Sequence, residues 1–303
     1  EIGRFVLDNV INLNFIVKKI FSNKIFVLSI TLTFAILFTS FSFLLPNKYS
    51  SQAVVRIPDI EGQEINQPLS SLGSIGSVVG VAGGSVADKS NIIIEILSSR
   101  DFVKSLIEAD ESFLIDLFSI NGFDKENFTS LYDENIYSPK AGWVKKPSGI
   151  YNERKPGYVE AHRLFRKSFT IFKDPKTGVI VLSFTHYSPI FAKEVIDSVI
   201  LHINRTYKEN ELAKIEKRLD YLQEELISAD LEVVRVSLSN MIETAMKEQT
   251  IATTSEQYAL ESIDNSFYPD FKSSPNRIFI LIFSSFIGFI ISVLYVVFFK
   301  KEI

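Results

Sequence analysis

The chain has 303 residues, of which 46% are hydrophobic and 22% charged, and its formal net charge is −4. This length can hold two ordinary domains, and the mildly acidic balance disfavours nucleic acid as a partner. The sequence contains no cysteine, which excludes a disulfide framework and a cysteine nucleophile within it.

Two uncharged apolar runs, Ile25–Leu45 and Ile278–Phe299, hold the excess hydrophobicity. As a helix, each run of roughly 20 residues reaches about 30 Å, the thickness of a bilayer core. A buried core helix is the alternative for either run. A signal peptide is a poor reading of the first, because its stretch is too long and no A-x-A-like site precedes Pro46. We predict transmembrane helices at 25–45 and 277–299, with a cytoplasmic interfacial segment at 1–24.

Basic residues predict the orientation of these spans. Lysine and arginine near the spans are Arg4, Lys18, Lys19 and Lys24 before the first, Lys300 and Lys301 after the second, and Lys48, Lys272 and Arg277 between them. The positive-inside rule places both ends in the cytoplasm, including a tail at 300–303, and places residues 46–276 in the periplasm. That middle segment has more Asp and Glu than Lys and Arg. Its charge argues against nucleic acid and lipid headgroups as its main ligands.

The first part of the middle segment begins with a predicted strand. "KYSSQAVVRI" alternates and is rich in β-branched residues. Five glycines follow within residues 73–84, but neither G-x-x-x-x-G-K-[ST] nor G-x-G-x-x-G is present. A surface loop is therefore a better reading than a phosphate-binding loop.

Further along, helical and strand patterns alternate. "NIIIEILSSRDFVKSLIEADESFLIDLF" has a helical period with a break near Ser98–Ser99. Residues 121–160 show no clear pattern. "KSFTIFKDPKTGVIVLSFTH" predicts two strands joined by a turn at Asp174–Gly178, and "YALESI" predicts a short strand before the second span.

A long helical tract occupies about 188–256, with no glycine or proline between Pro189 and Thr254. As one helix it would extend roughly 100 Å. Alternate spacings of four and three define a heptad seam typical of coiled coils. The seam is Leu212, Ile215, Leu219, Leu222 and Leu226, continued by Ala229, Val233 and Val236. Two readings are open and compatible: an oligomerisation seam between subunits, or an intrachain hairpin that bends near Ser228–Asp230.

Residues suited to catalysis are missing from the sequence. His162, His186 and His202 have no metal-ligand spacing and are interpreted as satisfied surface histidines. Neither G-x-S-x-G nor H-E-x-x-H occurs, and the carboxylate pairs Asp110–Glu111 and Glu224–Glu225 are expected on solvated helix faces. We therefore predict no catalytic, cofactor-binding or metal-binding residues.

The order of these elements resembles the Wzz family of polysaccharide co-polymerases, the O-antigen chain-length determinants. The likeness is closest at 216–277, with a Leu- and Glu-rich helix, Met241-Ile242-Glu243 as the family's "Leu-Ile-Glu", a Tyr-Ala strand, and a proline-rich approach to the second span. "ILSSRDFV" and Gly288 also match family positions. Residues 110–165 match loosely. The family's "Ile-Asp-Pro-Ala" is replaced by Ile263-Asp264-Asn265-Ser266.

This resemblance implies an α+β membrane protein in which two transmembrane helices flank a periplasmic α/β base with a projecting helical region. It implies a ring of more than four subunits in the inner membrane, beside a Wzy-type polymerase that joins undecaprenyl-diphosphate-linked glycan units. No cofactor is implied. Pro269, Pro275 and Gly288 are then expected to serve transmembrane packing and contact with the polymerase.

The expected function is non-enzymatic control of O-antigen and lipopolysaccharide chain length. The alternative is a capsule or exopolysaccharide export or co-polymerase protein of related architecture. A two-span sensor is disfavoured by the short tail after Phe299, a tyrosine-kinase co-polymerase by the missing P-loop, and a periplasmic enzyme by the missing site chemistry.

Overall fold

The computed structural model describes residues 13–58, 86–144 and 155–299. These residues form two compact units. The first contains the described parts of Glu1–Lys48 and Phe271–Ile303, and the second contains the described parts of Tyr49–Asp270. The start of the predicted interfacial segment, the glycines at 73–84 and the tail at 300–303 lie outside the described residues. Helices and strands are mixed in the chain, which confirms the α+β class.

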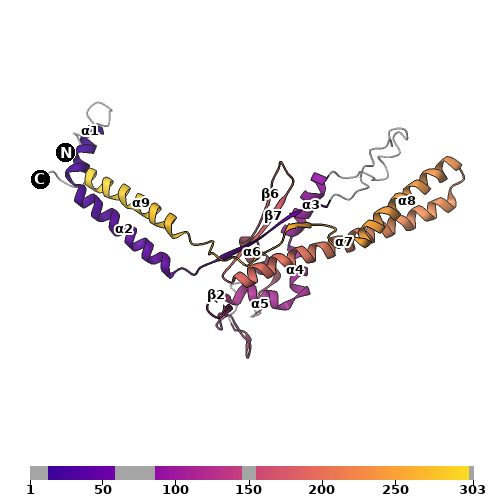
Figure 1. Ribbon diagram of the computed structural model, residues 1–303, viewed down its shortest axis with the longest axis horizontal. Helices are drawn as coiled ribbons and strands as arrows, with labels where there is room; N and C mark the ends of the chain where they lie inside the picture. The colour runs from indigo at the N-terminus through magenta and orange to yellow at the C-terminus, as the bar shows by residue number, and fades with distance from the viewer. Residues whose placement is uncertain (1–12, 59–85, 145–154, 300–303) are drawn as a thin grey trace. The chain divides into compact units, whose positions relative to one another are not determined.

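The first unit is built from helices α1 (Leu13–Ser22), α2 (Lys24–Leu44) and α9 (Arg277–Phe298). Figure 1 shows α2 and α9 side by side. Both are long and apolar enough to cross a membrane, with mean hydropathies of 2.1 and 2.6. They coincide with the two predicted spans to within a residue at each end, and together they fit a two-pass membrane protein.

The second unit contains a four-stranded antiparallel sheet. Its order is β6 (Phe169–Lys173), β7 (Ile180–His186), β1 (Tyr49–Arg56) and β8 (Glu261–Asp264). The predicted turn joins β6 to β7. The Asp174 carboxylate accepts hydrogen bonds from Lys176 N at 2.9 Å and Thr177 Oγ1 at 2.8 Å, and Gly178 has φ +71°. Glycine adopts this left-handed conformation without a steric cost.

Helices bury the sheet and supply most of the core. They are α3 (Val86–Ser98), α4 (Arg100–Ala109), α5 (Glu111–Ser119), α6 (Tyr158–Ser168) and α7 (Pro189–Ser228). The largest fully buried side chains around the sheet include Phe165, Phe184, Ile180, Leu182 and Ile196. The predicted break near Ser98–Ser99 is confirmed, because the Ser99 hydroxyl accepts from Phe102 N at 3.1 Å and so begins α4 as its N-cap.

Two small hairpins occupy the region that shows no clear pattern in the sequence. They are β2 (Ile120–Asp124) with β3 (Thr129–Tyr132), and β4 (Tyr137–Ser138) with β5 (Gly142–Trp143). The Trp143 ring packs edge-on against Phe118 and Tyr137. Short strands and aromatic contacts, rather than a periodic apolar face, organise this part of the chain.

The long helical tract is an intrachain hairpin. The 40-residue helix α7 ends at Ser228, the chain turns through 229–231, and α8 (Glu232–Thr254) returns along α7 (Figure 1). At about 1.5 Å per residue, α7 extends about 60 Å. Of the two open readings, the hairpin is therefore present, and a single helix of roughly 100 Å is not formed.

Candidate functional surfaces

The central residues of the heptad seam pack against another helix of the same chain. Ile215 and Leu219 of α7 pack with Ala245 and Ile242 of α8, and Leu222 is also buried. Leu212 and Leu226 are half-buried. The structure therefore gives these leucines a role in closing the hairpin, while their role in oligomerisation stays a prediction.

The expected continuation of the seam is wrong, because the chain reverses direction at 229–231. Val233 and Val236 are 74% and 52% exposed and do not extend the buried row. They belong instead to an exposed apolar tip, which also includes Ile227, Leu231 and Val234. A concentration of aliphatic side chains at one end of a hairpin is typical of a protein contact surface.

The paired helices of the first unit meet at small residues. The buried positions on α9 include Ser284, Gly288 and Ser292, spaced four apart. A Cβ built on Gly288 would lie 2.8 Å from the Cβ of Phe34 and 3.2 Å from the Cα of Thr31. Only glycine permits this approach of α2 to α9, which is the role that small residues have in membrane helix pairs.

Polar contacts hold the pair at both ends. Lys48 N donates to Ser274 O at 2.9 Å and Ser273 N donates to Lys48 O at 2.8 Å, so the segments beyond α2 and before α9 pair as a short bridge. At the other end, Lys19 Nζ donates to Val297 O at 3.1 Å. Pro275 follows the bridge in this unit, whereas Pro269 belongs to the unit Tyr49–Asp270. Polymerase contact at either proline stays a prediction.

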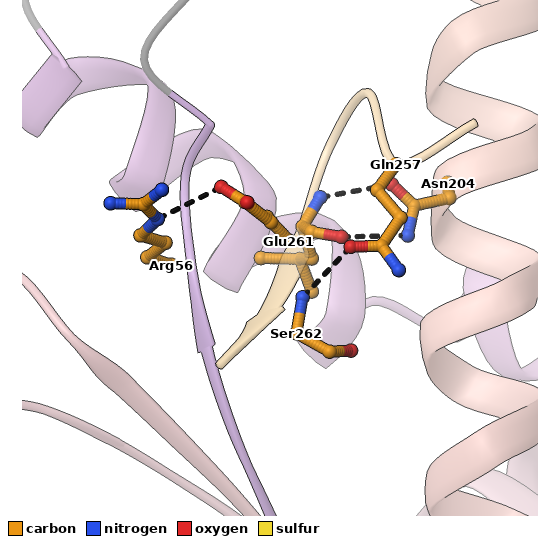
Figure 2. A network of polar contacts seen from close by, with 6 residues as sticks. Arg56, Asn204, Gln257, Glu261 and Ser262 are labelled. Atoms are coloured by element: carbon orange, nitrogen blue, oxygen red, sulfur yellow. Dashed lines mark hydrogen bonds and ion pairs between the residues drawn. The ribbon is translucent and has the colours of Figure 1, made fainter. Parts of the chain in front are cut away.

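A buried amide joins α7 to the segment that leads into β8. Asn204 Oδ1 accepts from Ala259 N at 2.7 Å and from Leu260 N at 2.9 Å. Its Nδ2 donates to Leu260 O at 2.9 Å and to Ile200 O at 3.0 Å. Figure 2 shows Asn204 reaching from the helix to this segment. The amide uses both donors and both acceptor positions, so the junction is fully satisfied.

Around that amide, side chains connect β8 to its neighbours (Figure 2). Arg56 Nε on β1 pairs with Glu261 Oε2 at 2.8 Å, and Ser262 N donates to Gln257 Oε1 at 3.0 Å. Beyond β8, where the sequence departs from the family pattern, the buried Ser266 hydroxyl donates to the Asp197 carboxylate of α7. The base of the hairpin and the sheet are therefore one hydrogen-bonded structure.

Two carboxyl groups beside the start of α7 have raised pKa values. Burial is the main cause at Asp116, whose Oδ1 accepts from the Tyr132 hydroxyl at 2.9 Å. Burial and then the nearby Asp116 raise the pKa of Glu194. Burial, followed by the bond to Asp116, raises the pKa of Tyr132 to about 12. Perturbed carboxyl groups also occur at functional sites, but in the described part of the chain no group of acidic residues and histidines could hold a metal ion.

The histidines are dispersed, and two of them are buried. His186 and His202 are 5% and 6% exposed, so their assignment as surface residues is wrong. His186 packs against the rings of Phe184 and Phe191. His202 Nε2 lies 2.8 Å from Ser105 Oγ, and burial lowers its pKa. His162 is half-buried. Within 13–58, 86–144 and 155–299, no group of histidine and acidic residues could hold a metal ion.

Sequence reasoning missed Asn204 and the carboxyl pair. The signal for Asn204 was a single amide placed among Val199, Ile200 and Ile203 on an otherwise apolar part of α7. A polar side chain on such a face is costly unless it is bonded, so a buried junction could have been inferred. Asp116 and Glu194 come from distant segments, and nothing in the sequence pairs them.

Comparison with known proteins gives a family match in the N-terminal third. Residues 9–109 match the family model described as Wzz, chain length determinant protein. This stretch includes α2, β1 and α4. Among curated proteins, none matches the chain.

Three solved structures are similar to the chain at low identity. A full-length bacterial polysaccharide co-polymerase is 13% identical, covers 95% of this chain and 96% of its own, and has a TM-score of 0.37. A fragment of WzzB, a polysaccharide co-polymerase from Salmonella Typhimurium, is 12% identical over 75% of this chain and 100% of its own, at a TM-score of 0.32. A mutant of the Shigella flexneri lipopolysaccharide O-antigen chain-length regulator WzzBSF is 13% identical. The match covers 75% of this chain and 100% of that one, and its TM-score is 0.24. At these scores the superpositions carry no argument.

Proposed function

We propose that this chain is a chain length determinant, which sets the modal length of O-antigen on lipopolysaccharide without itself performing chemistry. The proposal is supported by the match of residues 9–109 to the family model described as Wzz, chain length determinant protein. The observation that carries the proposal is the position of that match, which includes α2 and continues into the Tyr49–Asp270 unit as far as the end of α4. The proposed site of action is the inner membrane, beside a Wzy-type polymerase and its undecaprenyl-diphosphate-linked glycan. Helices α2 and α9 would anchor the regulator, and the Tyr49–Asp270 unit would act in the periplasm.

Deletion of the gene is expected to leave polysaccharide present but to change its length distribution from modal to broad, because a regulator is lost rather than an enzyme. The measurement is a gel of the cell's lipopolysaccharide. Complementation with His162→Ala should restore the modal distribution, since this half-buried histidine contacts the backbone carbonyl of Ser98 and belongs to no group in the described residues that could hold a metal ion. Complete loss of polymer, restored only by a version with its histidines intact, would overturn the regulator in favour of an enzyme. A change in capsule alone would support the export alternative.

The proposed topology predicts the behaviour of reporter fusions. Asp174 lies in the turn between β6 and β7. The basic residues Lys18, Lys19 and Lys24 favour a cytoplasmic start of α2 and therefore a periplasmic Asp174. A reporter that is active only in the periplasm should be active when fused after Asp174 and silent when fused after Ile303. Activity of the fusion after Ile303 would contradict the two-pass arrangement.

Assembly into a ring of more than four subunits is proposed to use the exposed apolar tip. Leu231 and Val233 are 69% and 74% exposed, so neither side chain is needed to close the hairpin of one chain. The double change Leu231→Asp with Val233→Asp should leave the fold intact and reduce the mass of the assembly, because charges would be buried without partners. Light scattering of the full chain in mild detergent measures that mass.

A matched control is Met246→Asp on α8, which is 54% exposed and lies outside the tip. It should leave the mass unchanged. A wild-type protein that is monomeric under these conditions, or an unchanged mass in the double variant, would remove the tip from the assembly surface.

A further inference from the structure

Four aromatic rings form a continuous row on the Tyr49–Asp270 unit. Tyr49 meets Phe123 at 5.9 Å between ring centroids, Phe123 meets Phe128 at 5.4 Å, and Phe128 meets Tyr268 at 5.8 Å. Every contact is edge-to-face, the arrangement that aromatic quadrupoles favour. We call these four residues the aromatic row. Rings from β1, from the β2–β3 hairpin and from the end of the unit are thereby collected at one place.

The hairpin presents Phe128 outward at a conformational cost. Asp124 Oδ1 accepts from Glu126 N at 2.9 Å and from Asn127 N at 3.3 Å, which shapes the turn. Phe128 then has φ +52°, a left-handed conformation that bulky residues rarely adopt. Its ring is 52% exposed. A strained residue that holds an apolar ring half in solvent is unfavourable in water, and it indicates a surface with an apolar or interfacial partner.

The row sits where the chain enters and leaves this unit. Tyr49 follows α2 after Leu45–Lys48 alone, and Tyr268 precedes α9 by a short connection. A residue extends the chain by at most about 3.6 Å, so Tyr49 lies within roughly 20 Å of the end of α2. When α2 spans a bilayer, that distance keeps Tyr49 within reach of the headgroup layer.

The composition of the row matches a membrane interface. Lys125 Nζ lies over the Tyr49 ring at 5.9 Å, and Lys193 Nζ lies over the Tyr268 ring at 5.2 Å. Aromatic rings with one polar edge, and lysines whose stems follow apolar surface, concentrate at the level of lipid headgroups. Phe267 beside the row is 50% exposed. The acidic balance of residues 46–276 makes attachment by charge alone unfavourable, so aromatic burial would supply the attraction.

From the strained ring, the row and its distance from the spans, we propose that the exposed rings of the row, Phe128 and Tyr268 at 52% and 46% exposure, form a seat on which the Tyr49–Asp270 unit contacts the lipid headgroup layer, while the buried Tyr49 supports them from within the unit. The seat lies beside the N-terminal end of α7, where Ser130 Oγ donates to Ser188 Oγ, the N-cap of α7, at 2.7 Å. The apolar tip lies at the other end of that helix, about 60 Å away. The proposed lipid contact and the proposed subunit contact therefore lie at opposite ends of α7.

The test uses the full chain in bilayer nanodiscs of phosphatidylcholine. Trp143 is the chain's one tryptophan, so Trp143→Phe gives a silent background into which Phe128→Trp or Tyr268→Trp is placed. Lipids brominated near the headgroup end of the acyl chain should remove more than half of the emission at either position. Tyr221→Trp on α7, a 58% exposed ring outside the row, is the matched control and should keep its emission.

Equal emission in plain and brominated lipid at both positions 128 and 268 would overturn the seat, and would favour a second subunit or another protein as the cover. Quenching that requires anionic lipid would overturn the aromatic mechanism in favour of charge. If either Phe128→Trp or Tyr268→Trp fails to fold, quenching is measured at the other position. None of these results depends on which polymer the cell makes, so failure of the seat and failure of length control are distinguishable.

Discussion

Replacing Asn204 by Leu is expected to destabilise the full chain by several kcal/mol. The change removes one amide but leaves the backbone groups Ala259 N, Leu260 N and Leu260 O buried without partners. An unsatisfied buried polar group costs about 1–3 kcal/mol, and domains are stable by only about 5–15 kcal/mol. Thermal unfolding in mild detergent measures the loss. The gel of lipopolysaccharide should show a broad length distribution, because the strand and the hairpin base would separate.

Asn210→Leu provides the matched control, since it makes the same substitution on an exposed position of the same helix. It should leave the unfolding temperature nearly unchanged. Asn204→Asp is a second variant, in which the carboxylate keeps two acceptor bonds, loses the donor bonds to Leu260 O and Ile200 O, and gains a buried charge. If Asn204→Leu unfolds at the same temperature as Asn210→Leu, the junction contributes little and the sheet holds β8 by itself.

Local sequence signals predicted the elements whose partners are close along the chain, and they predicted the two long apolar helices. The two apolar helices were predicted from the length of their uncharged runs alone, and the β6–β7 hairpin was predicted from the turn at Asp174–Gly178. The break before α4 followed from its serines, because Ser99 is a side-chain cap. For the hairpin and the cap, the residues that indicate the element in the sequence and the residues that they contact belong to one short segment of the chain.

Other features depended on contacts between distant segments. A bend near Ser228–Asp230 was one of two open interpretations of the sequence, and the packing of Ile215 and Leu219 on α8 shows that the hairpin is formed. The pairing of Asn204 with Ala259 and the row through Phe128 likewise exist only after folding. Heptad spacing shows that a helix face is apolar, but it does not distinguish a partner helix of the same chain from one of another subunit.

Replacing Gly288 by Leu is expected to separate α2 from α9 and to alter polysaccharide length without stopping synthesis. Even the first added carbon would lie 2.8 Å from the Cβ of Phe34 and 3.2 Å from the backbone Cα of Thr31, and a backbone atom cannot rotate away. Overpacking of this kind typically costs about 1–3 kcal/mol. The cost would fall on the helix pair, since membrane helices associate through close packing rather than through a hydrophobic driving force. The lipopolysaccharide gel and the unfolding temperature in detergent measure the two effects.

Thr33→Leu separates this packing effect from a general effect of added bulk in the membrane. Thr33 lies on the exposed side of α2, and its hydroxyl bonds only within its own helix, to Ser29 O at 2.8 Å. Leucine there would face lipid, so both the unfolding temperature and the length distribution should stay close to wild type. The unfolding temperature of Gly288→Ala should lie between those of Gly288→Leu and Thr33→Leu, because alanine introduces the clashing carbon without the branched side chain. Wild-type polymer length in Gly288→Leu, at normal expression, would show that the distance between α2 and α9 does not matter for length control.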